Sequence, residues 1–210
     1  MSIEKAYNSW AEQYDTNDNK TRDLDIKSTI ETLSKYEFKN VLELGCGTGK
    51  NTDWLRTKAE RIIGLDFSQK MLNIAAEKIT ANNVEFKKSD LIKEWEIENQ
   101  FADLITSSLT LEHIADLNQI FNQANQKLID NGIFFISELH PFKQYTGSKA
   151  RYVTKDGIEE LKVYTHHISD YLDNAKNNGF ELLEIKEWFD EKSEKEIPRL
   201  ISFVFRKKNS

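Results

Sequence analysis

The sequence contains little cysteine, proline or glycine, and each shortage excludes a class of protein. The 210 residues include one cysteine, two prolines and eight glycines. A single cysteine cannot form an internal disulfide, and it excludes a cysteine-based metal site. No Pro- or Gly/Ser-rich linker divides the chain, so we expect one domain over residues 1–210. No apolar run approaches the ~18 residues that a membrane helix needs, so we expect no membrane span.

Positive charge is scarcer than negative charge. The chain has 29 Lys and Arg against 35 Asp and Glu, a formal net charge of −6. Because phosphates would be repelled on average, this balance argues against nucleic acid as a partner. The opening MSIEKAYNSW lacks the basic and then apolar pattern of a signal peptide. We therefore expect a cytoplasmic protein, whose oligomeric state the sequence leaves open.

Apolar strands alternate with helical segments through the middle of the chain. We expect strands at residues 41–44, 61–65, 84–86, 102–106 and 133–137. Because helices separate these strands, they predict an α/β fold with a doubly wound, mainly parallel sheet covered on both faces. Two later strands, at 180–189 and 200–206, are joined by a loop too short for a crossover helix. They are therefore predicted to pair antiparallel.

Helices are expected at residues 3–15, at about 24–36 with Ile26, Ile30 and Leu33 on one side, and at about 50–58. A further helix is expected to begin at Ser169 and to stop at Gly179. Around Lys155-Asp156-Gly157, alternating residues predict a hairpin.

Three of the eight glycines lie within five residues at the end of the first predicted strand, in Gly45-Cys46-Gly47-Thr48-Gly49. Glycine there permits positive φ and lets a ligand lie against bare backbone, and the helix that follows offers free N–H groups. A plain structural turn is the alternative for a glycine triplet taken alone. The dinucleotide fingerprint wants a small residue at position 50, where this chain has Lys50, so the spacing counts against a nicotinamide dehydrogenase.

Acidic residues stand near the same predicted edge of the sheet. Glu43 precedes the glycine turn, and Asp66 and Asp90 follow the next two strands. A carboxylate at Asp66 can accept hydrogen bonds from both hydroxyls of a ribose, and one at Asp90 from the amine of adenine. A solvated helix cap is the alternative for each acid alone. Because ligands bind at the carboxyl edge of such sheets, the ordered set predicts a nucleotide site.

These segments together resemble a known family. VLELGCGTG, GLDFS, FKKSDL and FADLITSSLTLEHI are similar to the class I S-adenosylmethionine (SAM)-dependent methyltransferases. The likeness is greatest to the small-molecule type 11 branch, which includes ubiquinone/menaquinone and malonyl-carrier-protein methyltransferases. It implies a Rossmann-like seven-stranded sheet with an antiparallel last strand, N-terminal helices and a small cap insertion. It also implies SAM as cofactor, S-adenosylhomocysteine (SAH) as product, and no metal.

The resemblance also implies which positions hold the cofactor. Glu43 and the glycine turn would hold the methionine part, Asp66 the ribose and Asp90 the adenine amine. Cys46 is interpreted as a small residue of the backbone loop and not as a nucleophile. The full set is Glu43, Gly45, Cys46, Gly47, Thr48, Gly49, Asp66, Phe67, Ser68, Met71, Asp90, Leu91, Ser107 and Leu109. The implied layout is an N-terminal helical cap (1–38), a cofactor-binding core (39–140), a substrate-cap insertion (141–168), and a last helix with the antiparallel strand pair (169–210).

The expected activity is an in-line transfer of a methyl group to an O, N or C nucleophile of a small molecule. Such a displacement needs mainly alignment, and a general base only when the acceptor holds its proton at neutral pH. Methylation of a carrier-bound acyl group, of RNA or of protein is the alternative, as is a non-enzymatic SAM-binding protein. The basic residues Lys143, Lys149, Arg151, Lys155 and Lys162 favour an anionic acceptor, with a solvated face as the alternative.

Two histidines are candidate bases, and aromatic or basic residues are candidate substrate contacts. His140, just past the fifth strand, is the better base candidate and His113 the second, with a rim position as the alternative for each. His166 and His167 are expected to point to opposite faces of a strand, which argues against a metal site. The candidate substrate contacts are Tyr7, Trp10, Tyr14, Tyr145, Arg151, Tyr152 and Arg199. For Tyr7, Trp10 and Tyr14, packing in the core is the alternative.

Overall fold

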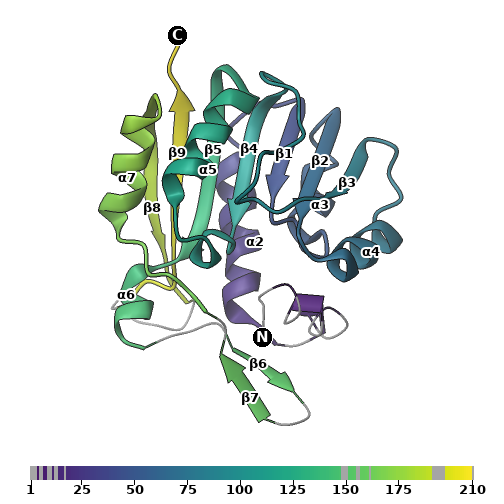
Figure 1. The fold of residues 1–210 in the computed structure, drawn as a ribbon, viewed down its shortest axis with the longest axis vertical. Coiled ribbons are helices and arrows are strands. Elements are labelled where there is room, and N and C mark those ends of the chain that lie inside the picture. Colours follow the sequence, from purple (N-terminus) through teal and green to yellow (C-terminus); the bar gives the residue numbers. More distant parts are fainter. Residues whose placement is uncertain are drawn as a thin grey trace.

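A seven-stranded sheet forms the centre of the molecule, as seen in a computed structural model (Figure 1). The structure describes residues 4, 7, 8, 11, 14–16, 18–147, 151–154, 157–160, 162–190 and 197–209, with the backbone alone described at 151–154 and 157–160. The strand order is β3-β2-β1-β4-β5-β9-β8. The strands are β1 (Asn40–Leu44), β2 (Arg61–Asp66), β3 (Val84–Lys88), β4 (Ala102–Ser108), β5 (Leu128–Leu139), β8 (Phe180–Trp188) and β9 (Leu200–Lys207).

The strand directions confirm the predicted sheet. The pairs from β3 through β2, β1 and β4 to β5 are parallel, whereas β9 is antiparallel to both β5 and β8. The sheet is thus Rossmann-like, with a single antiparallel strand inserted between β5 and β8. Because β8 and β9 follow one another through a short loop, they could only pair in this direction.

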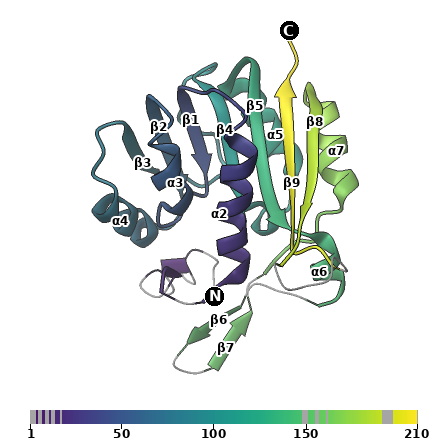
Figure 2. The same cartoon turned by 180° about the vertical axis from the view of Figure 1, so that it is seen from behind.

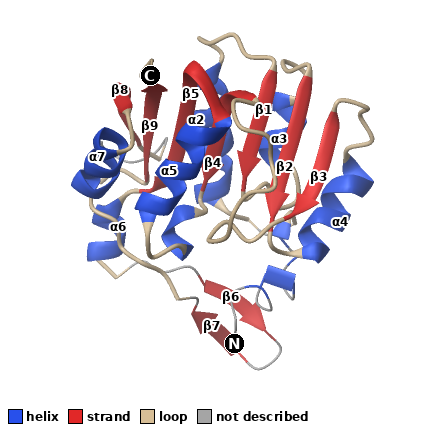
Figure 3. Cartoon of the chain, turned by 45° about the horizontal axis from the view of Figure 1, so that its top comes forward, coloured by secondary structure: helices blue, strands red, loops and turns tan. Residues whose placement is uncertain are grey.

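Helices cover both faces of the sheet (Figures 1 and 2). α2 and α3 lie on one face, and α5 and α7 lie on the other, as their mutual contacts confirm. Figure 3 shows α4 beside the edge strand β3. The helices are α2 (Lys20–Leu33), α3 (Lys50–Leu55), α4 (Gln69–Lys78), η1 (a 3₁₀ turn, Leu111–His113), α5 (Leu117–Lys127), α6 (Pro141–Tyr145) and α7 (Ile168–Asn177).

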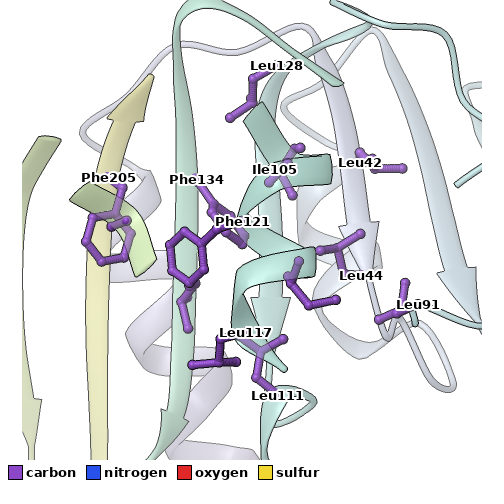
Figure 4. Packing of buried hydrophobic residues seen from close by; sticks show 14 of the residues in the cluster. Leu42, Leu44, Leu91, Ile105, Leu111, Leu117, Phe121, Leu128, Phe134 and Phe205 are labelled. Carbon is purple, nitrogen blue, oxygen red and sulfur yellow. The ribbon is translucent and has the colours of Figure 1, made fainter. Parts of the chain in front are cut away.

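Aromatic residues fill the core between α5, β5 and β9 (Figure 4). Phe121 of α5 packs edge-on against Phe134 and Phe205, with ring centroids 5.3 and 5.6 Å apart. On the opposite face, a second cluster joins Leu33 of α2 to Phe135 of β5. Because both faces of β5 are buried, its sequence Ile133–Ile136 is apolar throughout and not alternating.

Several element boundaries differ from those expected. α2 begins at Lys20 and not near Leu24, because the side chain of Asn19 accepts a hydrogen bond from Arg22 N and caps the helix. α3 ends at Leu55. β5 is longer than expected at both ends, because Leu128 pairs with Ala102 of β4 and Glu138 and Leu139 pair with β9. α7 begins at Ile168, capped by His167 through a reciprocal contact with Asp170.

The predicted hairpin is present beyond the carboxyl edge of the sheet. β6 (Arg151–Thr154) pairs antiparallel with β7 (Gly157–Glu160), and Figures 1 and 2 show the pair below the central sheet. The expectation that His166 and His167 lie on a strand was wrong, because both precede α7 in a connecting segment. The described residues of the first predicted helix are helical at positions 4, 7, 8, 11 and 14.

Candidate active site

Two adjoining cavities lie where the parallel strands end. An inner cavity lies between the glycine turn, α2 and the end of β4. An outer cavity of about 540 Å³ lies beside Asp66, Asp90 and His113. Gly45 and Leu109 line both cavities, so the two form one groove across the carboxyl edge.

The glycine turn is packed too closely for a side chain at its first position. Gly45 has φ +68°, and a Cβ atom there would lie 2.1 Å from Oγ1 of Thr110. Gly45 N and Cys46 N both donate to the carbonyl of Leu65, at 2.8 and 3.0 Å, which ties the turn to β2. The turn therefore presents bare backbone to the groove, as the sequence predicted. Burial raises the pKa of the Cys46 thiol well above its usual value.

Asp66 lies at the end of β2 and supports the same turn. Its carboxylate accepts hydrogen bonds from Gly47 N at 2.9 Å and from Ser68 N at 2.8 Å. Burial raises its pKa to about 6, against the lowering effect of these backbone N–H groups. Ser68 in turn caps α4 by accepting from Met71 N. Asp66 thus braces the glycine turn from within the wall of the outer cavity.

The inner cavity is rich in hydrogen-bond acceptors. Glu43 is buried, its carboxylate accepts from Thr52 Oγ1 at 2.5 Å, and burial raises its pKa to about 8. Asp25 of α2 accepts from Asn51 Nδ2 at 3.0 Å, and burial raises its pKa to about 6. Asn51 Oδ1 and Thr106 Oγ1 are buried without a hydrogen-bond partner among the described residues. These groups suit a cationic ligand with N–H donors.

Basic groups line the same cavity. Arg22 donates to the carbonyl of Tyr14, and Lys50 stands at the start of α3. Thr48 is held by its Oγ1, which donates to Asp15 Oδ1 at 2.7 Å. The inner cavity therefore offers both signs of charge, as a zwitterionic ligand requires.

The outer cavity combines apolar and acidic walls. Phe67 and Leu91 line it together with Asp90, whose carboxylate is half-exposed and 3.8 Å from Lys93 Nζ. Asp90 Oδ1 also accepts from Ile92 N at 3.3 Å, which shapes the loop after β3. A planar ring could lie between these apolar side chains with its polar edge toward Asp90.

Tyr7 and His113 meet on the wall of the outer cavity. The Tyr7 hydroxyl lies 2.7 Å from Nε2 of His113, and the two rings pack edge to face. Nδ1 of His113 faces the carbonyl of Lys162 at 3.4 Å, so we assign its proton to Nδ1. Nε2 is then the acceptor for the Tyr7 hydroxyl. Burial lowers the pKa of His113 and raises that of Tyr7, so both are neutral at pH 7.

Other predicted site residues lie elsewhere. His140 caps α6, since its Nδ1 accepts from Phe142 N, and its Nε2 lies 3.2 Å from Glu187 Oε1. It is not among the described residues that line either cavity, whereas His113 is. Of the two base candidates, the structure thus places only His113 beside the groove.

Some of the candidate substrate contacts line a cavity, and others do not. Tyr7 lines the outer cavity and Tyr14 the inner one. Arg199 forms a two-point ion pair with Asp190, at 2.6 and 2.5 Å, and Tyr145 is 55% exposed with its hydroxyl on His167 Nδ1. Trp10 lies outside the described residues, and the structure describes only the backbone of Arg151 and Tyr152.

Four predicted cofactor residues are buried and do not line either cavity among the described residues. They are Gly49, Ser68, Met71 and Ser107, although Thr106, Ser108 and Leu109 line the groove. Successive side chains of a strand point to opposite faces, so Ser107 points away from the side on which Thr106 and Ser108 line the groove.

Sequence reasoning missed the contribution of α2. Arg22, Asp25, Thr29 and Thr32 are buried and repeat at helical spacing, and Arg22 and Asp25 of this polar stripe line the inner cavity. We expected Ile26, Ile30 and Leu33 on one side of this helix, and of these three only Leu33 is fully buried. The three- and four-residue spacing of these polar residues is the sequence pattern from which their buried face could have been predicted.

Comparison with known proteins agrees with this geometry. Residues 42–136 match a family described as a methyltransferase domain. The matched segment contains the glycine turn, Asp66, Asp90 and the β4 turn. The chain thus contains a methyltransferase domain.

Relatives of this methyltransferase cover different shares of its length. It is 26% identical to an uncharacterized methyltransferase of Emericella nidulans, over 85% of this chain and 76% of the relative. It is 32% identical to a malonyl-[acyl-carrier protein] O-methyltransferase of Acetivibrio thermocellus, over 67% of this chain and 46% of the relative. The chain thus spans about half the length of such carrier-protein methyltransferases.

Solved structures share the fold. A SAM-dependent methyltransferase of Clostridium acetobutylicum superposes with a TM-score of 0.75 at 21% identity, covering 97% of this chain and 100% of the other. The DhpI–SAH complex gives a TM-score of 0.76 at 21% identity, covering 99% of this chain and 96% of the other. Within the described part of this methyltransferase, no helix is long and apolar enough to cross a membrane.

Proposed function

We propose that this methyltransferase transfers a methyl group from SAM to a nucleophile on a small molecule. When bound, SAM supplies an electrophilic methyl group on a sulfonium. One observation carries the proposal: the glycine turn, Asp66 and Asp90 follow one another along a single groove with an acceptor-rich inner end. Structural relatives support the proposal, since DhpI was solved in one complex with SAH and in another that contains SAM.

The inner cavity fits the methionine part of the cofactor by charge. Glu43, Asp25 and the unpartnered Asn51 Oδ1 would receive an ammonium group. Arg22 and Lys50 would face a carboxylate. Asp25 and Glu43 have raised pKa values in the ligand-free protein, so a bound cation would favour their ionised forms.

The outer cavity fits the adenosine part. Asp66 would accept from ribose hydroxyls, and Phe67 and Leu91 would pack against the adenine ring. Asp90 would accept from its exocyclic amine. This assignment repeats, for the lining residues, what the sequence resemblance implies.

We assign the general base to His113, with Tyr7 as its hydrogen-bond partner. Nε2 of His113 is unprotonated and accepts from the Tyr7 hydroxyl on the wall of the outer cavity, so a proton from an acceptor hydroxyl or amine can reach it through that hydroxyl. The lowered pKa of His113 keeps this nitrogen unprotonated at neutral pH. An anionic acceptor stays a prediction. Of the basic residues that support this prediction, the structure describes the side chains of Lys143 and Lys162. Lys162 Nζ lies 4.9 Å from the centroid of the Tyr164 ring.

A carrier-bound carboxyl group is the second candidate acceptor, favoured by the 32% identity to a malonyl carrier-protein methyltransferase. A carboxylate is already ionised at neutral pH and needs no base. Replacing His113 would then leave kcat nearly unchanged. For a hydroxyl or amine acceptor, the same change would lower kcat by about 10²-fold or more.

Two measurements test the proposal. Titration calorimetry with SAH and with NAD identifies the cofactor: binding of SAH alone supports the proposal, and binding of NAD alone overturns it. A cell extract is then incubated with methyl-labelled SAM and the enzyme, and fractionated by size. Label in the small-molecule fraction supports the first acceptor class, whereas label confined to macromolecules favours the second.

A further inference from the structure

The turn after β4 is held at its amino end by a buried acid. Oε1 of Glu138, the penultimate residue of β5, accepts hydrogen bonds from Thr110 N at 2.9 Å and Leu111 N at 2.8 Å. Glu138 is 1% exposed. Two successive backbone N–H groups thus converge on one oxygen, which fixes where η1 begins.

The same turn is held at its carbonyl end by a buried histidine. Nε2 of His166 lies 2.8 Å from the carbonyl oxygen of Ile114 and 3.2 Å from that of Leu111. Carbonyls only accept, so this nitrogen carries a proton and donates. The imidazole packs edge to face on Tyr171 of α7, with centroids 5.9 Å apart. His166 therefore has a structural task unrelated to metal binding.

The turn needs such support because its own backbone geometry is unfavourable. η1 is a single 3₁₀ turn, which has poor hydrogen-bond geometry of its own. Leu109, which lines both cavities, has φ +51° in the left-handed region that non-glycine residues disfavour. Strain of this kind persists only where the surroundings hold it.

The segment that carries His166 also joins the turn to the hairpin. After β7, Lys162 offers its carbonyl to His113 Nδ1 at 3.4 Å, and Tyr164 N donates to the carbonyl of Glu112 at 2.7 Å. His166 follows two residues later. The chain returning from the hairpin thus runs along η1 and touches it at three places.

We propose that Glu138 and His166 are positioning residues that clamp residues 109–114, hold His113 toward Tyr7 and hold Leu109 in the groove. The proposal rests on the proposed function only for its kinetic readout. Neither Glu138 nor His166 is among the described residues that line the groove, so each acts through the turn.

Paired substitutions of His166 test the carbonyl end. His166→Gln keeps a side-chain N–H donor, whereas His166→Phe keeps the ring and removes the donor. We expect kcat to fall by about 10- to 100-fold in His166→Phe, as for a misplaced catalytic group, and by less than about 3-fold in His166→Gln. The KM for SAM should change less than kcat in both variants.

A spectroscopic readout separates positioning from general stability and needs neither cofactor nor turnover. In the ligand-free protein, side-chain ¹⁵N shifts of His113 should show one tautomer with the proton on Nδ1. They should show the same in His166→Gln and exchange averaging in His166→Phe. A folded His166→Phe protein with the wild-type His113 spectrum and kcat would overturn the proposal.

Glu138 provides an independent test if His166→Phe does not fold. Glu138→Gln keeps an acceptor oxygen, and Glu138→Leu removes it. The proposal expects the His113 spectrum to be kept in the first variant and lost in the second. Indistinguishable His113 spectra in two folded variants would refute it. Failure of SAH binding in the wild-type protein would overturn the proposed function alone, since the spectrum reports the clamp directly.

Discussion

The hydroxyl of Tyr7 lies 2.7 Å from Nε2 of His113, although 106 positions separate the two residues in the chain. Tyr7 also packs edge-on against Phe67, with centroids 5.7 Å apart. One aromatic side chain therefore joins the turn after β4 to the loop after β2 along the wall of the outer cavity. Tyr7 thus forms part of a groove wall that the strands of the central sheet do not provide.

Removing either partner of this contact should slow methyl transfer to a hydroxyl or amine acceptor. We expect His113→Asn to lower kcat by about 10²-fold, since it removes a proton acceptor, and Tyr7→Phe to lower it less. Steady-state kinetics at pH 7.5 would measure both. Tyr36→Phe, at a partly buried tyrosine that is not among the described groove-lining residues, is the matched control and should behave as wild type. An unchanged kcat in His113→Asn would instead favour a carboxylate acceptor.

Asp66 should contribute strongly to cofactor affinity. Asp66→Ala removes a charged acceptor and also frees Gly47 N, so SAH binding should weaken by about 1–3 kcal/mol. Titration calorimetry gives this value directly, and Asp66→Asn should lose less because one acceptor oxygen is kept. Asp53→Asn, at an exposed acid paired with Arg56, should leave the Kd unchanged. Equal Kd values for wild type and Asp66→Ala would show that Asp66 does not contact the cofactor.

Gly45 and Thr110 should show a specific steric coupling. Gly45→Ala places a methyl group 2.1 Å from Thr110 Oγ1 at a positive φ, so overlap adds to backbone strain, each at a cost of about 1–3 kcal/mol. Gly47→Ala, with no atom within 4 Å of the new Cβ, should cost only the strain. Chemical denaturation would measure both. Adding Thr110→Ala should partly restore Gly45→Ala, and additive effects in the double variant would contradict the packing.

The buried acids should make the ligand-free protein less stable as the pH rises above neutrality. Burial raises the pKa of Glu43 and of Glu138 to about 8, so the folded protein holds protons that the unfolded chain releases. This stabilisation is complete below the ordinary pKa of a glutamate and is lost as the pH passes 8. Each carboxyl should cost about 1 kcal/mol per pH unit near pH 7–8, which corresponds to roughly 2–4 °C in Tm.

Thermal melts between pH 7 and 9 test whether Tm falls as the pH rises. The histidines His113 and His140 do not interfere, because their lowered pKa values place their titration below pH 7. Glu43→Gln should flatten the slope, and Glu60→Gln, at an exposed glutamate paired with Lys39, should not. A Glu43→Gln protein with the full wild-type slope would show that Glu43 is ionised in the folded state.

The strand-ending features were predictable because they depend on local sequence and one topological rule. Gly45 to Gly49, Asp66 and Asp90 each follow an apolar strand, and parallel strands bring their carboxyl ends to one edge. The antiparallel pairing of β8 and β9 followed from the short loop between them. Element boundaries were less predictable, because caps such as Asn19 and His167 compete with other polar residues nearby.

The positions of the two base candidates relative to the groove could not be predicted, because they depend on contacts between distant segments. His113 and His140 both follow strands at the same edge, and only the packed structure shows that His140 caps α6 while His113 meets Tyr7. The buried polar face of α2 was missed for a related reason. A helix that borders a ligand cavity buries polar residues on that side, and a search for apolar periodicity does not find them.

The sequence by itself therefore determined the parallel strands and the antiparallel pairing of β8 and β9, because strand periodicity and loop length act over short distances. Its motifs carried the resemblance to a family and, with it, the inserted antiparallel strand. Tertiary structure alone decided the partner of His113, the ion pair that occupies Arg199, and the support of the β4 turn by Glu138 and His166. These depend on hydrogen bonds and ion pairs between side chains that the sequence leaves far apart. Such contacts form only when packing has fixed the distance between their elements.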